Sequence, residues 1–193
     1  MKVGLFFGSF NPIHNGHLVI AEYMATQTDL DEVWFVVSPH NPFKNKKNLA
    51  NDYDRLAWVQ DAIADNPKLK VSSIEFNLPQ PSYTIVTLTL LREKFPEKKF
   101  HLIMGGDSLL SLPKWKNADI LMRDFPIYVY TRPEYDTSSF QNNPHILIFK
   151  EVPQMNISAS YIRNCLREGK SVRYLIPDIV LNAISLSSHY KNV

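Results

Sequence analysis

Short apolar runs alternate with longer segments of helical periodicity along this chain, and no other feature of its sequence restricts the possible folds as strongly. The runs are rich in Val, Ile and Phe, which is typical of strands covered on both faces. They predict strands at residues 3–7, 33–37, 100–104, 127–130 and 146–149, and a weaker strand at 71–76. The remaining periodic segments predict helices at 17–25, 53–64, 84–95, 117–122, 160–168 and 177–186. The expected fold is a Rossmann-like, doubly wound α/β sheet of parallel strands, in which ligands bind beyond the carboxyl ends of the strands.

Residues at the helix ends support these boundaries. Asn51 or Asp52 can cap the second helix, Gly169 follows the fifth, and Pro177 suits the first turn of the last. With 193 residues and 45% apolar content, the chain can bury one substantial core. No internal repeat or low-complexity tract divides the sequence, so we expect residues 1–193 to form a single domain that includes the two C-terminal helices.

The overall charge and the cysteine content narrow the class of protein. With 21 basic and 19 acidic residues the formal charge is only +2, which argues against a nucleic-acid partner but allows a local anion site. The single cysteine, Cys165, permits no intramolecular disulfide and no cysteine-based zinc cluster. The apolar run at 3–7 is broken by Gly8, Asn11 and Pro12 before it could form a signal-peptide core or a membrane span. We therefore expect a soluble, cytoplasmic protein.

The segment after the first strand is the strongest candidate for a functional site. Residues 8–17 read Gly-Ser-Phe-Asn-Pro-Ile-His-Asn-Gly-His and lead into an apolar helix. A glycine-containing turn and a helix start bring unpaired backbone N–H groups toward one point, where the helix dipole favours an anion. His14 and His17 can lie on one face and direct ring N–H donors at the same phosphate, and Gly16 removes a side chain that would crowd it. The arrangement predicts a nucleotide phosphate site.

A metal site and simple packing are two other interpretations of the histidine pair, because a lone His-x-x-His is weak evidence. His40, His101, His145 and His189 form no metal-ligand spacing with the pair, and no cysteine or His-Glu-x-x-His pattern supports zinc. We therefore expect no metal ligands from the protein. The Gly-x-x-x-x-Gly-Lys-Ser/Thr pattern of P-loop NTPases is absent as well.

A second candidate anion site lies in residues 156–163, which read Asn-Ile-Ser-Ala-Ser-Tyr-Ile-Arg. Ser158 can cap the helix that follows, while Ser160 and Arg163 offer a hydroxyl and a guanidinium near its positive end. Taken alone, the segment could equally be an N-capped helix with an exposed arginine. Residues 39–52, which include three lysines, predict a loop that either closes over an anionic ligand or is simply solvated.

With these motifs the sequence resembles the nucleotidylyltransferase superfamily, and within it the bacterial nicotinate mononucleotide adenylyltransferases. The resemblance covers nearly the whole chain. It rests on residues 8–17 and 156–163 for the superfamily, and on 38–44, 81–84, 105–107, 112–115 and 132–133 for the narrower family. The sequence departs from the commoner pattern at Phe7-Gly8-Ser9, at Asn11, which replaces an aspartate, and at Glu134, where glycine is common.

The resemblance implies transfer of AMP from ATP to nicotinate mononucleotide in NAD biosynthesis, giving nicotinate adenine dinucleotide and pyrophosphate, with Mg²⁺ bound through the ATP phosphates. By position, it implies ATP binding by Gly8, Ser9, Phe10, His14, Gly16, His17, Gly105, Asp107, Ile157, Ser158, Ser160 and Arg163. Within that set, His14, His17 and Arg163 would be catalytic, and Gly105 and Asp107 would contact the adenosine. The acceptor would be bound by Lys44, Tyr83, Thr84, Trp115 and Arg132, with Lys44 at its phosphate.

Several alternatives to this function stay open at the level of the sequence. Nicotinamide mononucleotide or phosphopantetheine could be the acceptor in the same chemistry, although the residues around Tyr83 and Trp115 argue against phosphopantetheine. A noncatalytic nucleotide-binding module is an alternative of another class, because class I aminoacyl-tRNA synthetases use a related His-x-Gly-His site. The short chain and its balanced charge argue against that module. A homo-oligomer is compatible with the sequence.

Overall fold

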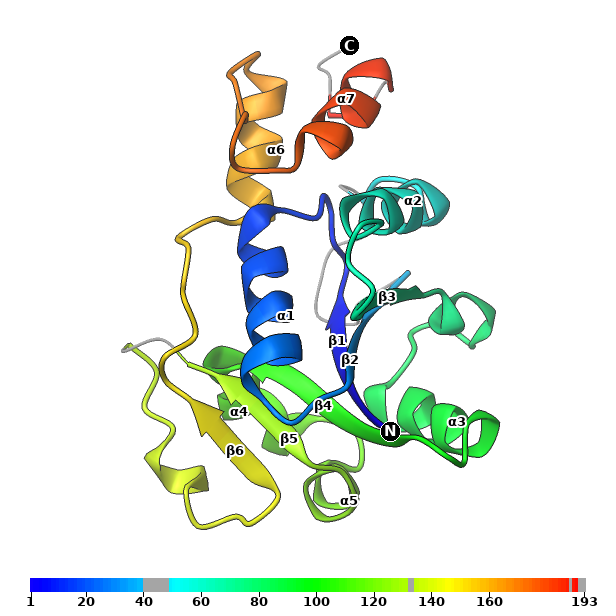
Figure 1. Cartoon of the computed structure of the whole chain (residues 1–193), viewed down its shortest axis with the longest axis vertical. Helices are drawn as coiled ribbons and strands as arrows, with labels where there is room; N and C mark the ends of the chain where they lie inside the picture. The colour runs from blue at the N-terminus through cyan, green and yellow to red at the C-terminus, as the bar shows by residue number, and fades with distance from the viewer. Residues whose placement is uncertain (40–48, 132–133, 188, 191–193) are drawn as a thin grey trace.

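Six parallel strands form one twisted sheet in the computed structural model of the chain (Figure 1). The structure describes residues 1–39, 49–131, 134–187, 189 and 190. The strands are β1 (Lys2–Gly8), β2 (Glu32–Val37), β3 (Leu69–Ser72), β4 (Lys99–Gly105), β5 (Ile127–Tyr130) and β6 (Ile146–Phe149). They lie in the order β3-β2-β1-β4-β5-β6, and every neighbouring pair is parallel. Strands β1 to β3 are added toward one edge of the sheet and strands β4 to β6 toward the other, so the strand order reverses between β1 and β4. Doubly wound sheets bind ligands at such a point.

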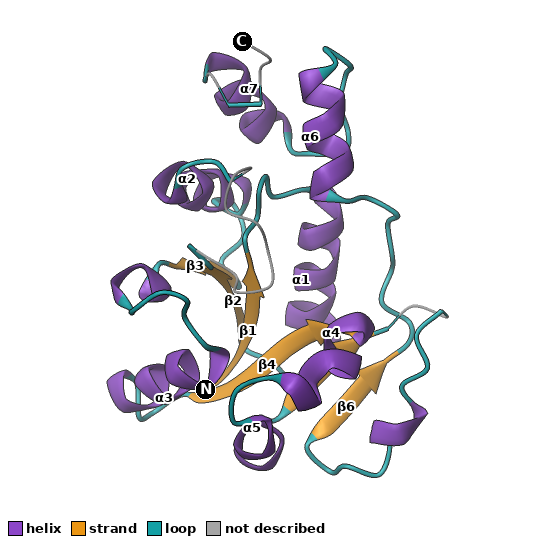
Figure 2. Cartoon of the chain, turned by 180° about the vertical axis from the view of Figure 1, so that it is seen from behind, coloured by secondary structure: helices purple, strands orange, loops and turns teal. Residues whose placement is uncertain are grey.

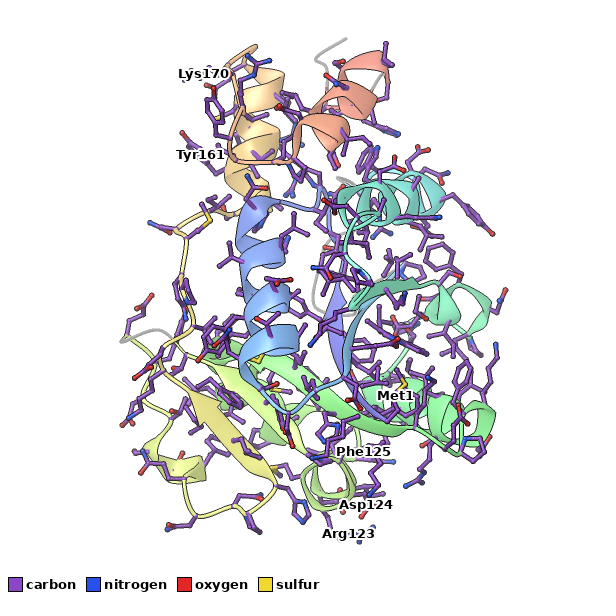
Figure 3. The ribbon with its side chains drawn as sticks, in the orientation of Figure 1. Met1, Arg123, Asp124, Phe125, Tyr161 and Lys170 are labelled. Atoms are coloured by element: carbon purple, nitrogen blue, oxygen red, sulfur yellow. The ribbon has the colours of Figure 1, made fainter. Side chains whose placement is uncertain are left out.

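Helices cover both faces of this sheet (Figure 2). The first face is covered by α1 (Asn15–Gln27) and α2 (Asp52–Ala62), while α6 (Ala159–Arg167) and α7 (Asp178–Leu186) lie beyond the carboxyl ends of the strands, with α7 next to α2 (Figures 1 and 2). The second is covered by α3 (Thr84–Lys94), α4 (Gly106–Ser111) and α5 (Ala118–Asp124). Three short 3₁₀ helices complete the described elements: η2 (Ile74–Asn77), η3 (Leu112–Lys114) and η4 (Ser138–Phe140). In Figure 3 Arg123 and Asp124 of α5 lie at the opposite end of the molecule from Tyr161 of α6.

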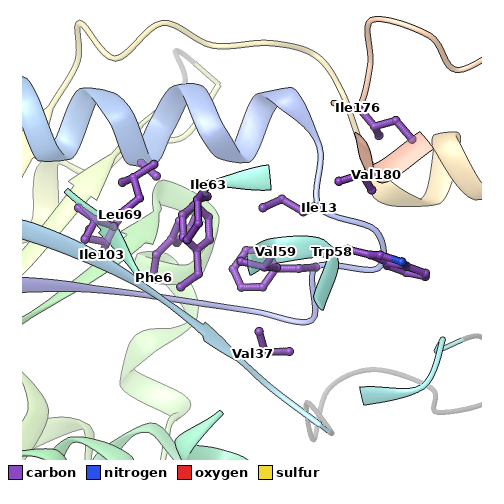
Figure 4. Packing of buried hydrophobic residues seen from close by; sticks show 14 of the residues in the cluster. Phe6, Ile13, Val37, Trp58, Val59, Ile63, Leu69, Ile103, Ile176 and Val180 are labelled. Atoms are coloured by element: carbon purple, nitrogen blue, oxygen red, sulfur yellow. The ribbon is translucent and has the colours of Figure 1, made fainter. Parts of the chain in front are cut away.

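The sheet has a hydrophobic cluster on each face, because successive side chains of a strand point to opposite sides. On β1, Phe6 belongs to the cluster beneath α1 and α2, whereas Leu5 belongs to the cluster beneath α3, α4 and α5. Figure 4 shows part of the first cluster, in which strand side chains such as Phe6 lie near α2, and Val180 of α7 lies near Ile13 and Ile176. Ile162 of α6 and Val180 of α7 belong to it as well. The two C-terminal helices thus share the hydrophobic cluster of this face, and α7 packs against α2. None of the helices in the described residues is long and apolar enough to cross a membrane.

The predicted elements are confirmed to within two residues at each end, with one exception. The strand predicted at 71–76 is wrong in its second half, because β3 ends at Ser72 and η2 follows. The N–H of Ile74 donates to the hydroxyl of Ser72 (3.3 Å), and such a local bond satisfies the backbone without a neighbouring strand. Helix α4 was not predicted, since its six residues are too few to show helical periodicity.

The predicted helix ends agree with the structure in most details. The side chain of Asn51 accepts from the N–H of Tyr53 (2.9 Å) and caps α2. Gly169 follows α6 with φ +67°, a left-handed conformation that favours glycine. Pro177 is the N-cap residue of α7 and lies just before the first turn, one position earlier than predicted.

Candidate active site

Two adjoining cavities open where β1 and β4 end at the reversal of strand order. The first has a volume of about 580 Å³ and the second about 470 Å³. Phe6, Phe7, Gly8 and Tyr130 line both of them, so two small molecules bound in the cavities would meet near these residues. Each volume suits a ligand of the size of a mononucleotide.

The first cavity brings the two predicted anion motifs together, although Asn11 and Arg163 are 152 residues apart in the chain. The N-terminal ends of α1 and α6 meet beside it, as Figures 1 and 2 show. Two helix ends directed at one place supply backbone N–H groups and positive dipole ends for an anion. Ten of the twelve residues implied for ATP binding line this cavity: Gly8, Ser9, Phe10, His14, Gly16, His17, Ile157, Ser158, Ser160 and Arg163.

The two histidines of the first motif stack on each other on the cavity wall. Their ring centroids are 3.6 Å apart and the ring planes differ by 19°. The backbone N–H of His14 donates to Nδ1 of His17 (3.3 Å), which places the proton of a neutral His17 ring on Nε2. The ring of Phe10 packs edge-on against His17 with the centroids 5.1 Å apart. The predicted placement of both histidines on one face is confirmed.

His14 is the more buried of the pair, with 6% of its surface exposed. Burial lowers the pKa of its imidazole to about 4, so the ring is neutral at pH 7 in the ligand-free protein. Its Nδ1 has no hydrogen-bond partner in the part of the chain that the structure describes. A Cβ at Gly16 would lie 3.1 Å from this nitrogen, so a larger residue there would crowd His14. A buried ring nitrogen without a hydrogen-bond partner lowers the stability of the fold, and a bound ligand could supply the missing partner.

Arg163 joins the second motif to the first. Its Nη1 donates to the backbone carbonyl of Asn11 (2.8 Å), and its Nη2 donates to the hydroxyl of Ser160 (3.0 Å). Its Nε is buried and has no partner among the described residues. Burial lowers the pKa of the guanidinium, which still stays protonated near neutral pH. Ser158 caps α6 as predicted, because its hydroxyl accepts from the N–H of Tyr161 (3.2 Å).

The second cavity is lined by Tyr83, Thr84 and Trp115, three of the five residues implied for the acceptor. Thr84 is the first residue of α3, and among the described residues the side chain of the N-cap residue Tyr83 makes no capping hydrogen bond. The first backbone N–H groups of α3 are therefore left for a ligand or water. The indole Nε1 of Trp115 donates to the hydroxyl of Ser111 (3.2 Å), which restricts the orientation of the ring.

Gly105 and Asp107 line the second cavity rather than the first. Gly105 ends β4 and is the N-cap residue of α4, so Asp107 lies in the first turn of α4 and is not its cap. A Cβ at Gly105 would lie 3.3 Å from the ring of Tyr130, which borders both cavities. The contact of these two residues with adenosine stays a prediction. Lys44 and Arg132, the other two residues implied for the acceptor, lie outside the described residues.

Sequence reasoning missed Arg55, a residue of α2 with 0% of its surface exposed. Its guanidinium donates to the backbone carbonyls of Ser9, Ser38 (3.0 Å) and Ala50 (3.1 Å) and to the carboxylate of Asp52 (2.6 Å). One side chain thus joins the segments that follow β1, follow β2 and precede α2. The signal that could have identified Arg55 is its spacing of three and four residues from Trp58 and Val59, which places it on the apolar face of the helix.

The hydrogen bonds of the Asn11 side chain are a second feature that the sequence did not predict. Its side-chain oxygen accepts from the N–H of Ala50 (3.1 Å) and from the hydroxyl of Tyr190. A carboxylate can accept the same two bonds, because both donors approach an oxygen atom. The departure from aspartate at this position therefore keeps the contacts that hold the turn.

Glu75 is a third residue whose role was not predicted. It is buried in the wall of the second cavity with 2% of its surface exposed. Its carboxylate accepts from the hydroxyls of Ser82 (3.0 Å) and Thr87 (2.8 Å). These bonds tie η2 to the start of α3 and so position Tyr83 beside the cavity. No feature of the sequence near residue 75 pointed to this role.

A doubly wound sheet with a donor-lined cavity beside an aromatic cavity at its switch point is typical of α/β proteins that bind nucleotides. A model of the cytidylyltransferase-like family matches residues 5–165. Two relatives, from Cytophaga hutchinsonii and Flavobacterium psychrophilum, are both named "probable nicotinate-nucleotide adenylyltransferase" and are 47% and 50% identical to this chain over 192 and 193 residues. The alignments cover 100% and 99% of this chain and 100% of each relative. The chain belongs to the cytidylyltransferase-like family and, within it, to the nicotinate-nucleotide adenylyltransferases, which are nucleotidyltransferase enzymes.

Solved structures show the same fold. The nicotinic acid mononucleotide adenylyltransferase of Plasmodium falciparum complexed with NaAD has a TM-score of 0.84, covering 98% of this chain and 97% of that one at 18% identity. The same protein complexed with APC has a TM-score of 0.81 at 18% identity, covering 98% of this chain and 96% of that one. The predicted fold class and the resemblance stated from the motifs are both confirmed.

Proposed function

We propose that this protein transfers the adenylyl group of ATP to nicotinate mononucleotide, giving nicotinate adenine dinucleotide and pyrophosphate in NAD biosynthesis. The observation that carries this assignment is the junction of the two cavities, one lined by both anion motifs and the other by Tyr83, Thr84 and Trp115. ATP in the first cavity and the acceptor in the second would meet beside Gly8 and Tyr130. Release of pyrophosphate from ATP in the presence of nicotinate mononucleotide tests the reaction.

The proposed chemistry is an in-line displacement at the α-phosphorus of ATP. An oxygen of the acceptor's 5′-phosphate forms the new bond to this phosphorus, while the bond to the β-phosphate oxygen breaks and pyrophosphate leaves with the electron pair. The nucleophile is already an anion, so no protein base is needed. The protein contributes alignment and donors for the charge on the α-phosphate and the leaving group, and we assign this role to His14, His17 and Arg163.

The cavity that each residue lines supports the other proposed binding roles. Ser160 would share the ATP phosphates with Arg163, while Tyr83, Thr84 and Trp115 would surround the pyridine ring. Since the core cluster on one face includes side chains of α6 and α7, we also propose that residues 1–193 act as a single domain. A cytoplasmic location is proposed with it, as the use of only one cysteine suggests.

Mg²⁺ is proposed to accompany ATP, held by the phosphate oxygens rather than by side chains. The first cavity presents imidazole, hydroxyl and guanidinium groups, which suit phosphate oxygens, whereas Mg²⁺ prefers oxygen ligands and keeps several waters. Among the described residues, no three His, Cys, Asp or Glu side chains are grouped to hold a metal ion. When bound, the ion would neutralise charge on the triphosphate.

The acceptor preference of the wild type is the first expected result. We expect kcat/KM for nicotinate mononucleotide to exceed that for nicotinamide mononucleotide by at least about 10²-fold. Backbone N–H groups at the uncapped start of α3 suit a carboxylate, which only accepts, and suit the NH₂ of an amide poorly. A coupled pyrophosphate assay with the two acceptors at equal concentrations measures the ratio. Equal use of both would contradict acid specificity while leaving adenylyl transfer intact.

The same assay applies to Trp115→Ala. An indole face stacks on either pyridine ring. This substitution should therefore lower kcat/KM for both acceptors by similar factors and leave the ratio of the two values unchanged.

Arg163→Lys is expected to lower kcat/KM about tenfold, because the variant keeps the charge and loses the planar fork. One ammonium group cannot reproduce the bonds to Asn11 and Ser160 and also meet a phosphate. Arg123→Lys is the matched control, since Arg123 is exposed and pairs with the adjacent Asp124 at the other end of the molecule (Figure 3). Full activity of Arg163→Lys would show that the guanidinium geometry is not used.

A further inference from the structure

One lysine that lines the second cavity has no role in the function proposed above. Lys116 lines this cavity, and its Nζ lies 4.4 Å from the centroid of the Tyr83 ring. This separation is within the range of a cation–π contact. The ammonium group is therefore beside one of the aromatic rings proposed to surround the pyridine.

The backbone around Lys116 is held on both sides. The N–H of Trp115 donates to the carbonyl of Leu112 (2.9 Å), and the indole donates to Ser111. On the other side Asn117 is the N-cap residue of α5 in a left-handed conformation with φ 53°. Asparagine is one of the few residues besides glycine that tolerates this region. Lys116, which lines the cavity, thus lies between a hydrogen-bonded Trp115 and the N-cap residue of α5.

The other charged groups that line the second cavity have different surroundings. Both oxygens of Glu75 accept from hydroxyls, and Asp107 lies in the first turn of α4, where the helix dipole favours a negative charge. Lys114, at the end of η3, is exposed, as Lys116 also is. Among the described lining residues, Lys116 is the cation placed over an aromatic ring.

The charge of the acceptor ring decides what such a cation does. A nicotinate ring bears a carboxylate as well as the pyridinium charge and has no net charge, whereas a nicotinamide ring has a net charge of +1. A nearby ammonium attracts the carboxylate of the first and repels the second. Resting on the proposed function, we propose that Lys116 is a specificity determinant that selects an acceptor with a carboxylate on its ring. Its charge adds to the effect of the backbone N–H donors at the start of α3.

The test compares kcat/KM for nicotinate and nicotinamide mononucleotides in the wild type and in Lys116→Met. The ratio of the two values should fall about tenfold in the variant, the scale of one charge-assisted contact. Most of this change should come from a lower kcat/KM for nicotinate mononucleotide. The kcat/KM for nicotinamide mononucleotide should rise slightly, because its cationic ring is no longer repelled. Added salt should lower the ratio in the wild type more than in Lys116→Met, since an exposed charge is screened.

Two further variants isolate the charge at this position. Lys116→Arg should keep most of the preference, while Lys116→Gln, a second neutral variant, should behave like Lys116→Met. Lys94→Met is the matched control: Lys94 lies at the other end of α3 with Nζ 5.6 Å from the Phe95 ring centroid, and it should leave the ratio unchanged.

The outcomes separate this inference from the function on which it rests. An unchanged ratio in both neutral variants, or an equal fall in Lys94→Met, would overturn the role of Lys116 and leave the adenylyl transfer intact. A wild type that releases no pyrophosphate with either acceptor would overturn the proposed function and this inference together.

Discussion

Replacing His17 with alanine is expected to reduce turnover by about 10²-fold or more, with a smaller change in the affinity for ATP. The stack on His14 and the bond from the His14 N–H orient the imidazole on the wall of the first cavity. A donor held in this way acts mainly on the charge that develops as pyrophosphate leaves, so its loss should appear in kcat. Initial rates at saturating ATP and acceptor measure kcat, and equilibrium binding of ATP measures the affinity.

His145→Ala serves as the control for this experiment, because His145 is exposed and lines neither cavity of the site. It should retain wild-type turnover. Near-normal turnover in a folded His17→Ala protein would defeat the catalytic assignment. If ATP affinity fell by the full factor while kcat was unchanged, His17 would be a ground-state binding residue instead.

Arg55→Met is expected to lower the free energy of unfolding by about 3 kcal/mol or more, on the scale of breaking a buried charged network. The methionine fills part of the volume but leaves the carbonyls of Ser9, Ser38 and Ala50 without their donor. Unsatisfied buried carbonyls are costly, and here they belong to segments that shape the first cavity. Urea unfolding followed by circular dichroism measures the change, with the slope of the transition checked for two-state behaviour.

Two further substitutions test whether the loss of stability is specific to the Arg55 guanidinium. Arg55→Lys should also be destabilised, because a single ammonium cannot reach acceptors on three segments. Arg123→Met removes an exposed arginine of α5 and should leave the unfolding midpoint unchanged. A wild-type midpoint in Arg55→Met would mean that the network around Arg55 contributes nothing to stability.

The sequence by itself determined the elements and the anion motifs. Strand and helix positions depend on the spacing of apolar residues within one segment, so β1 through α1 could be placed without knowing what packs on them. The His14–His17 pair and the Ser158 cap are equally local, since each involves residues three apart at a helix start. Helix α4 and the end of β3 escaped prediction because short segments show too little periodicity.

Only the tertiary structure decided which residues meet. Arg55 bonds Ser9 across 46 residues of chain, and Arg163 bonds Asn11 across 152. The sheet order, and not the spacing of the sequence, brings these groups together at the ends of β1 and β4. The same order placed Gly105 and Asp107 beside Tyr83 and Lys116 in the second cavity. Such contacts depend on how the chain crosses the sheet and on which polar groups become buried without water, and neither is encoded by neighbouring residues.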